Sequence, residues 1–193
     1  YNGAVQEGAA YYQQTAKNGF RCSTAVGFLN PIKNRHNLDI VTHALVERVV
    51  IEDGKTTGID ISVKDQARRY MLKPGGEVIL SAGAIGSPQI LQLSGVGPGT
   101  LLHGLDIPVI KDMPGVGANL FDHLQIRTVY EVNVPTLNAE INNFFRRMLI
   151  GMQYVLKRTG PMSMGASQVA IFAKSREGLE TPDIQYHFQP LSA

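Results

Sequence analysis

The sequence has 193 residues, of which 44% are hydrophobic and 18% charged, and its formal net charge at pH 7 is +2. These values are typical of a folded globular chain that forms one domain or parts of two, and the scattered basic residues provide no electrostatic footprint for nucleic acid. Cys22 is the single cysteine, which excludes an intrachain disulfide framework and a cysteine-rich zinc site, and which is compatible with a reducing compartment.

The two ends of the sequence are predicted to lie inside a longer chain. Residue 1 is tyrosine rather than methionine, and the sequence does not begin with a basic segment followed by an apolar run. The last residues follow a strand-like run without a helix cap or a polar tail. No stretch approaches the roughly 18 consecutive apolar residues that span a bilayer. We therefore expect an internal piece of a larger protein, and we expect no transmembrane helix within these 193 residues.

The N-terminal part of the sequence predicts helical segments followed by a small antiparallel sheet. Residues 4–16 are compatible with a helix, and Ser23 or Thr24 is placed to cap a short helix that runs to Phe28. Farther along, β-branched residues predominate, and the triplet DGK at residues 53–55 is a hairpin turn signal. The predicted strands of this β-meander cover residues 38–42, 46–52, 58–63 and 68–72.

A strand, a turn of small residues and a helix are predicted in succession after the meander, over residues 77–80, 81–88 and 89–94. Alanine and glycine at a strand end let a ligand approach the backbone, and unpaired N–H groups at a helix start favour a phosphate or another polar group. Pro88 suits the first helical turn, where its missing N–H would have no partner. This layout is typical of an α/β nucleotide site, but a plain tight turn has the same pattern.

The C-terminal part of the sequence predicts strands around one amphipathic helix. The helix covers residues 141–156 and is expected to bury Phe144, Met148 and Val155 together, with basic side chains on its polar face. A basic amphipathic helix can also lie on a membrane surface, but a core helix with a solvated basic face is the favoured interpretation. The predicted strands cover residues 124–132, 168–173 and 183–188.

The segment SAGAIGSPQILQLSGVGP at residues 81–98 resembles the second signature of the glucose-methanol-choline (GMC) oxidoreductases. The small-residue turn, the Ser-Pro pair and the Ser-Gly-Val-Gly ending of that signature are all present. The resemblance covers nearly all of residues 1–125. Four further segments are similar to the family: NGFRCSTA at 18–25, RHNLDI at 35–40, GLDIPV at 104–109 and PGVGANLFDH at 114–123.

The resemblance implies an α/β to α+β fold in two parts and FAD as the cofactor. Residues 1–123 would form part of an FAD-binding domain that includes the meander, and residues 124–193 part of a substrate-binding domain with an antiparallel sheet. In the family, the valine of an Ala-x-Val pattern contacts the flavin adenine, small residues of the second signature lie beside the flavin, and an asparagine lies near the isoalloxazine. By their match to these positions, the candidate cofactor-binding residues are Val46, Ser81, Ala82, Gly83 and Asn119.

The residue type of Val46 alone favours an ordinary core position in a strand, so its cofactor contact depends on the resemblance. The pair Asp122-His123 matches the same region as Asn119. We interpret this pair as supportive rather than catalytic, because adjacent residues rarely face one site.

No catalytic residue can be assigned within the sequence. The family's catalytic histidine has no matching context around any histidine of the chain, which are His36, His43, His103, His123 and His187. No G-x-G-x-x-G follows a predicted strand, so the dinucleotide fingerprint found near the start of the family's full chain is absent. Hydrolase and metalloenzyme motifs are absent as well, and no metal site is predicted. We expect the isolated chain to be inactive.

By resemblance, the full protein oxidises a primary or secondary alcohol by hydride transfer to the flavin N5, while a histidine assists removal of the hydroxyl proton. The expected electron acceptor is oxygen or a quinone-type compound. Residues 160–163 and 168–175 are most similar to bacterial choline and alcohol dehydrogenases, but Gln168 stands where many of them carry a glutamate, which leaves recognition of a quaternary ammonium open. The expected location is the cytoplasm, with at most a peripheral contact to the inner membrane.

Two other interpretations come from different classes of protein. A non-redox relative that keeps FAD only structurally, such as a hydroxynitrile lyase, shares the same motifs. A short non-catalytic interaction module is the second alternative. A full-length gene that contains a strand-preceded G-x-G-x-x-G would exclude the second alternative, and the context of the C-terminal histidine would discriminate the first.

Overall fold

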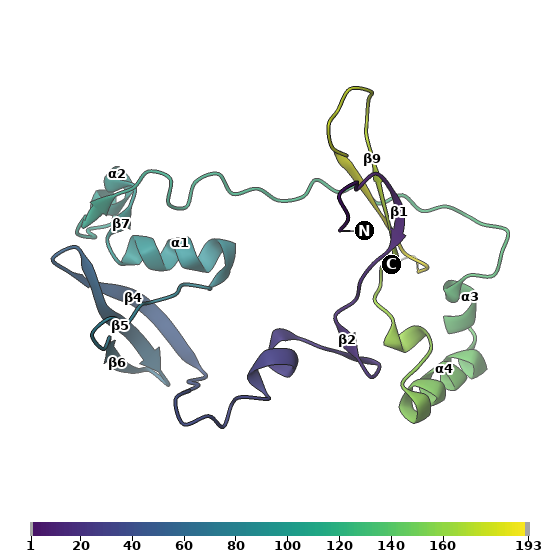
Figure 1. The fold of residues 1–193 in the computed structure, drawn as a ribbon, viewed down its shortest axis with the longest axis horizontal. Helices are drawn as coiled ribbons and strands as arrows, with labels where there is room; N and C mark the ends of the chain where they lie inside the picture. Colours follow the sequence, from purple (N-terminus) through teal and green to yellow (C-terminus); the bar gives the residue numbers. More distant parts are fainter. Residues whose placement is uncertain (1, 192–193) are drawn as a thin grey trace. The chain divides into compact units, whose positions relative to one another are not determined.

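The computed structural model describes residues 2–191, which form two compact units (Figure 1). The meander unit comprises residues 39–125, and the terminal unit combines the residues up to 38 with those from 126 onward. The predicted division after residue 123 falls close to the second of these junctions. The N-terminal residues nevertheless group with the C-terminal ones, because strand β1 (Gly8–Tyr11) pairs with strand β9 (Val169–Ala173). The assignment of the two parts to flavin and substrate stays a prediction.

The meander unit contains a three-stranded antiparallel sheet in the order β4 (Ala44–Glu52), β5 (Lys55–Val63) and β6 (Gln66–Met71). Asp53 and Gly54 both have positive φ, 49° and 73°, as a tight hairpin between two right-twisted strands requires. These strands confirm the three that were predicted from residue 46 to residue 72. The strand predicted over residues 38–42 does not form, and these residues lie in a loop before the sheet.

Helix α1 (Gly83–Leu93) packs against β4 and closes the core of the meander unit. The apolar side chains buried in this unit are Val49, Val50, Ile61, Ile90 and Leu102. The helix begins at Gly83 rather than at Gln89, so the predicted small-residue turn forms its first turns. Pro88 therefore lies inside the helix and not at its first turn. Because proline has no backbone N–H, the helix lacks the hydrogen bond from residue 88 to the Ala84 carbonyl.

Two further predicted strands do not form among residues 2–191. Residues 77–80 lead into α1, and residues 124–132 begin at the end of the meander unit. Neither segment pairs with a strand among residues 2–191. Ile79 and Leu124 are 82% and 97% exposed. An alternating or apolar segment becomes a strand only where its backbone finds a ladder partner, and the described chain provides none here.

After α1, the chain forms a small parallel pair of strands, β7 (Val96–Gly97) and β8 (Lys111–Asp112), joined through helix α2 (Gly99–Gly104). Leu102 of α2 is fully buried. The Gly99 N–H donates to Asp112 Oδ1 at 2.9 Å, which ties the start of α2 to the end of β8. This pair leads the chain from the end of α1 into the loop that carries Asn119.

The terminal unit contains a three-stranded antiparallel sheet in the order β1, β9 and β10 (Ile184–Phe188). Strands β9 and β10 confirm the prediction for residues 168–173 and 183–188. The helix predicted over residues 4–16 is wrong: its centre is strand β1, which pairs with β9 from the other end of the sequence. Ala170 of β9 is buried. Two further short strands, β2 (Ala16–Lys17) and β3 (Phe20–Arg21), form a hairpin.

The helices of the terminal unit are the π-helical turn η1 (Ala25–Leu29), α3 (Leu137–Ile141), α4 (Phe144–Lys157) and the 3-10 turn η2 (Pro161–Ser163). The short helix predicted to run to Phe28 is therefore present as one turn. Asn143 caps α4, because its Oδ1 accepts hydrogen bonds from the N–H groups of Phe145 and Arg146, both at 3.1 Å. None of the helices in residues 2–191 is long and apolar enough to cross a membrane.

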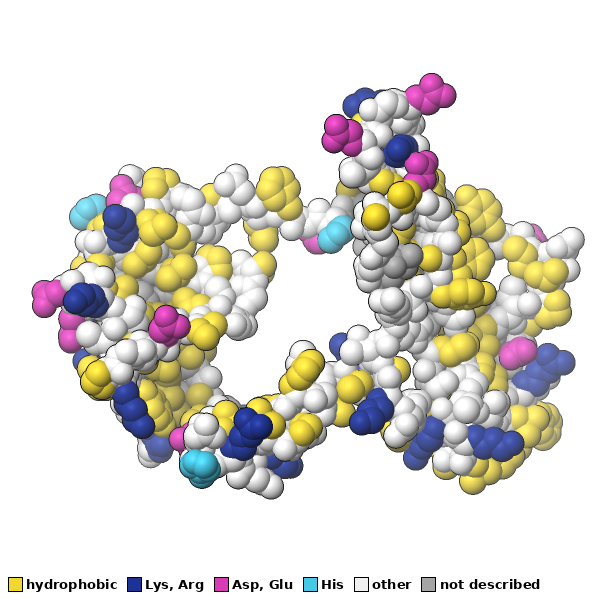
Figure 2. All heavy atoms as spheres, viewed as in Figure 1, with side chains coloured by type: hydrophobic (Ala, Val, Ile, Leu, Met, Phe, Trp, Pro, Cys, Tyr) yellow, Lys and Arg dark blue, Asp and Glu magenta, His cyan; other side chains and the backbone are white. Residues whose placement is uncertain are grey.

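The apolar face of α4 is not buried as predicted. Phe144, Met148 and Val155 are 63%, 51% and 64% exposed. Figure 2 shows hydrophobic side chains on the outer surface of α4, with Lys and Arg side chains beside them. The helix itself forms where its periodicity predicted, so the pattern determined the helix but not a partner for its apolar stripe.

Candidate functional site

The turn into α1 exposes its backbone. Ser81, Ala82 and Gly83 are all exposed, and Gly83 has a φ of +86°. A Cβ atom built on Gly83 would have no protein atom within 4 Å, so the space in front of this residue is open. The Ala82 N–H donates to Ser87 Oγ at 2.9 Å, which holds the turn from within the first turns of the helix. The backbone at Gly83 is therefore both accessible and fixed in a conformation that favours glycine.

The first N–H groups of α1 have no side-chain cap. Ala82 occupies the N-cap position and has no side-chain acceptor to offer. The first turn of any helix leaves N–H groups without intrahelical partners, and these groups attract an anion or a polar oxygen. The turn thus has the donors and the open space that a phosphate or ribose oxygen needs.

Val46 lies near the start of β4, where it pairs with Ile61 of β5 and is half-buried. The register of the two strands shifts between Val46 and Arg48, which is a β-bulge. Figure 1 shows β4 and α1 running in the same general direction, and the two elements pack together. Both elements therefore start at the same end of the meander unit. Val46 lies near the start of β4, and Gly83 is the first residue of α1.

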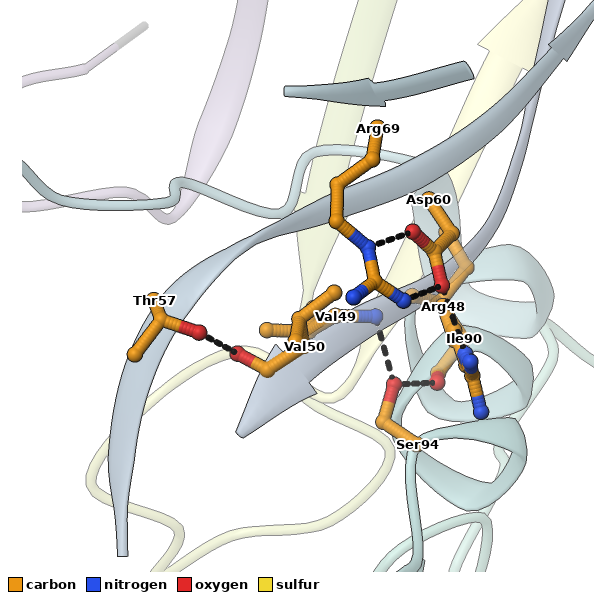
Figure 3. Close-up of polar contacts among 8 residues, drawn as sticks. All are labelled: Arg48, Val49, Val50, Thr57, Asp60, Arg69, Ile90 and Ser94. Atoms are coloured by element: carbon orange, nitrogen blue, oxygen red, sulfur yellow. Dashed lines mark hydrogen bonds and ion pairs between the residues drawn. The ribbon is translucent and has the colours of Figure 1, made fainter. Parts of the chain in front are cut away.

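A buried hydroxyl joins the last turn of α1 to β4 (Figure 3). The Val49 N–H donates to Ser94 Oγ at 2.8 Å, and the Ser94 hydroxyl donates to the Ile90 carbonyl at 2.6 Å. Ser94 is only 5% exposed. Ser94 belongs to the Ser-Gly-Val-Gly ending of the signature segment, and the sequence predicted no role for it. Its presence inside that motif was the available signal.

Asn119 lies in an exposed loop after β8, in the left-handed region with a φ of +57°. This loop is tied to α1 by Gln92, whose Nε2 donates to the Val116 carbonyl at 3.0 Å. Farther along, the His123 N–H donates to Asp122 Oδ1 at 2.8 Å. That bond is local to the pair and involves the His123 backbone, and no hydrogen bond of the His123 ring to residues 2–191 is seen.

Asp60 on β5 forms an ion-pair cluster with arginines of both neighbouring strands (Figure 3). Arg69 Nε lies 2.6 Å from Asp60 Oδ1, and Arg48 Nε lies 2.8 Å from Asp60 Oδ2. The hydrogen bonds from Arg69 and then Arg48 hold the pKa of the Asp60 carboxyl well below its usual range, because they favour its charged form. The cluster is therefore ionised at neutral pH. It joins the three strands and is not part of the turn at Gly83.

All the predicted cofactor-binding residues lie in the meander unit. Val46 and the turn from Ser81 to Gly83 belong to two elements that pack together, and Asn119 follows a loop that Gln92 ties to the same helix. No group of three His, Cys, Asp or Glu side chains within residues 2–191 is placed to hold a metal ion. The site therefore consists of backbone donors, small residues and one amide, which suits binding rather than proton transfer.

Comparison with known proteins identifies similar sequences and structures. The sequence model of the GMC oxidoreductases matches residues 1–125. The oxygen-dependent choline dehydrogenase of Pseudomonas putida (strain GB-1) is 42% identical over 192 residues, which are 99% of this chain and 34% of that protein. The chain thus spans about a third of the length of the curated relatives it matches.

Solved structures show the same fold. The FAD-dependent oxidoreductase from Chaetomium thermophilum is similar with a TM-score of 0.79 and 25% identity, over 88% of this chain and 30% of that one. A fungal aryl-alcohol oxidase is similar with a TM-score of 0.75 and 28% identity, over 87% of this chain and 29% of that one. These matches confirm the partial α/β to α+β fold that the sequence predicted. Because the family model covers well over half of the sequence, the chain belongs to the GMC oxidoreductase family.

Proposed function

We propose that the full-length protein is an FAD-dependent oxidoreductase that oxidises the CH–OH group of an alcohol, and that this chain supplies part of its flavin site. The observation that carries the proposal is the turn at Gly83, an open backbone at the start of a helix inside a segment that matches the GMC family. The named relatives support it, since they include a choline dehydrogenase and an aryl-alcohol oxidase.

The roles proposed for the residues follow from their chemistry. The N–H groups at the start of α1 would bind oxygens of the cofactor's ribose and diphosphate region, and Gly83 would let the cofactor approach the backbone. Val46 would provide an apolar contact for the adenine at the start of β4. The Asn119 side chain, exposed in its loop, would donate or accept a hydrogen bond near the isoalloxazine.

When bound, FAD supplies the redox chemistry by accepting hydride from the carbinol carbon of the alcohol. The chain contributes orientation and polar contacts. No residue of this chain is proposed as the base that removes the hydroxyl proton of the alcohol.

Choline is the first substrate candidate, because choline dehydrogenases from several species are about 40% identical to the chain. Gln168 is an argument against choline, because its neutral amide cannot supply the negative charge that a glutamate would offer to a quaternary ammonium. The Gln168 Nε2 atom lies 3.0 Å from Met164 Sδ. Oxygen is the proposed electron acceptor. A quinone-type acceptor and a peripheral membrane contact are the alternatives, and they are tested by assaying oxygen consumption against quinone reduction in soluble and membrane fractions.

The test is reduction of the flavin by an alcohol. The purified full-length gene product is mixed with choline or with benzyl alcohol in the absence of oxygen, and the longest-wavelength flavin band is followed. We expect one of the two alcohols to bleach this band and readmitted oxygen to restore it. Tetramethylammonium, which has the charge of choline without its CH–OH group, is the control and is expected to bleach nothing. A flavin that stays oxidised with every alcohol would favour a non-redox relative and contradict the proposal.

A further inference from the structure

The last turn of α1 is the point at which the segments of the proposed site are held together. Ser94 joins this turn to β4, which carries Val46, and Gln92 joins it to the loop that leads to Asn119. The same helix begins with the exposed turn at Gly83. The two side chains are separated by one residue and reach in different directions, so that one helical turn contacts both neighbouring segments.

The surroundings of these side chains leave little freedom. Ser94 is almost fully buried, and its hydroxyl both accepts from Val49 and donates to Ile90 (Figure 3). A Cβ atom on Gly117 would lie 2.6 Å from Gln92 Nε2, and one on Gly97 would lie 2.9 Å from Gln92 Cγ. A side chain at either glycine would therefore displace Gln92 from the position in which it reaches the Val116 carbonyl.

We infer that Ser94 and Gln92 are positioning residues of the flavin site: they fix the start of α1, β4 and the Asn119 loop relative to one another. The inference rests on the proposed function. A strand rises about 3.3 Å per residue, which puts Val46 roughly 10 Å along β4 from the Val49 anchor. A helix rises about 1.5 Å per residue, which puts Gly83 roughly 16 Å along α1 from Ser94.

A small rotation of α1 relative to β4 at the Ser94 contact therefore produces a larger displacement at Gly83 and at Val46. A binding constellation has to be held to within about 0.5 Å to remain productive. Removal of the Ser94 hydroxyl would leave the buried Val49 N–H without its acceptor and let α1 shift along β4. The loss of affinity for the cofactor would exceed the loss of folding stability, because the sheet hydrogen bonds of β4 with β5 remain in place.

The test compares Ser94→Ala with Ser94→Thr in the full-length gene product. Alanine removes the hydroxyl, whereas threonine keeps it. For Ser94→Ala we expect the Kd for FAD to rise about fivefold to tenfold and the visible circular dichroism of the bound flavin to change. Ser94→Thr is expected to restore both readouts toward the wild-type values. Far-UV circular dichroism and the Tm of the apoprotein are recorded for each variant to separate cofactor effects from folding.

Thr57→Val is the matched control, because Thr57 Oγ1 donates to the Val50 carbonyl at 3.5 Å within the same sheet and does not contact α1 through this bond. It is expected to leave the Kd and the flavin spectrum unchanged. If Ser94→Ala does not fold, Gln92→Glu decides instead, since it keeps the shape of the side chain but loses the donor to Val116. It is expected to raise the Kd in the same way.

A wild-type Kd and a wild-type flavin spectrum in Ser94→Ala, or in Gln92→Glu where that variant decides, would overturn the inference. An equal rise of the Kd in Thr57→Val would overturn it as well, because any loss in the sheet would then have the same effect. If the wild-type protein itself binds no FAD, the proposed function fails, and that failure is distinguishable from the failure of the positioning role.

Discussion

Replacement of Gly83 by valine is expected to abolish flavin retention by the full-length protein. Gly83 has a φ of +86°, where an L side chain costs about 1–2 kcal/mol and a β-branched one is least tolerated. The valine side chain would also fill the open space above the backbone through which the cofactor is proposed to approach. The measurement is the ratio of flavin to protein absorbance after purification, which should fall from near one flavin per chain to a negligible value.

Gly54→Val is the matched control for backbone strain. Gly54 has a φ of +73°, and a Cβ atom there would also meet no protein atom within 4 Å, but the residue lies in the β4–β5 hairpin. The two variants should lose similar stability, whereas only Gly83→Val should lose the flavin. Equal flavin loss in both variants would attribute the effect to strain alone.

Val46→Ala should be mild by the same measurement. It removes two methyl groups from a half-buried site, a loss of about 1–3 kcal/mol of stability at most, and it leaves the backbone of β4 in place. If Gly83→Val retained its flavin and Val46→Ala lost it, the assignment of the two segments to parts of the cofactor would be inverted.

The isolated chain of 193 residues is expected to bind FAD with a Kd well above about 1 µM, if it binds at all. Its sequence has no strand-preceded G-x-G-x-x-G, so the tightest contacts to a pyrophosphate are missing. The apolar side chains buried in its described residues are also few, Ala170 of the terminal unit and five in the meander unit. A site that must first be ordered binds more weakly by the cost of that ordering.

Titration of FAD fluorescence with the isolated chain checks this expectation. Far-UV circular dichroism, recorded on the same sample, reports whether the helices and strands are present. The full-length gene product, stripped of flavin and titrated in parallel, should bind at least a hundredfold more tightly, a difference of about 2.7 kcal/mol. Submicromolar binding by the isolated chain would contradict the prediction.

Local patterns predicted several elements whose partners are near in sequence. The meander from residue 46 to residue 72 follows from β-branched runs and the turn at Asp53 and Gly54. Helix α4 follows from its apolar spacing, but it begins at Phe144, after the cap at Asn143, and not at residue 141 as predicted. In each case the information that determines the element lies within the element or at its ends.

Elements that depend on distant partners could not be predicted in this way. Strand β1 pairs with β9 from the opposite end of the sequence, and its residues alone are also compatible with a helix. Residues 77–80 have an apolar strand pattern but no ladder partner among residues 2–191. The exposed apolar face of α4 illustrates the same limit for a helix. Periodicity identifies the apolar stripe, but it does not show which residues would pack against that stripe.

The candidate site was predictable only where a motif marked it. The turn at Gly83 follows from its small residues, whereas the candidacy of Val46 and Asn119 depends on the resemblance to the family. The link from Ser94 to Val49 was missed, because a side-chain hydrogen bond between residues 45 positions apart leaves no local pattern. The same is true of the contact between Gln92 and Val116.

The visible absorption spectrum of the purified full-length gene product tests the central claim most directly. The account predicts the two flavin bands, with about one FAD per chain released on denaturation, as expected for a cofactor held by backbone donors and an open glycine turn in a GMC fold. A folded protein that shows no flavin bands, and that acquires none after incubation with excess FAD, would contradict it.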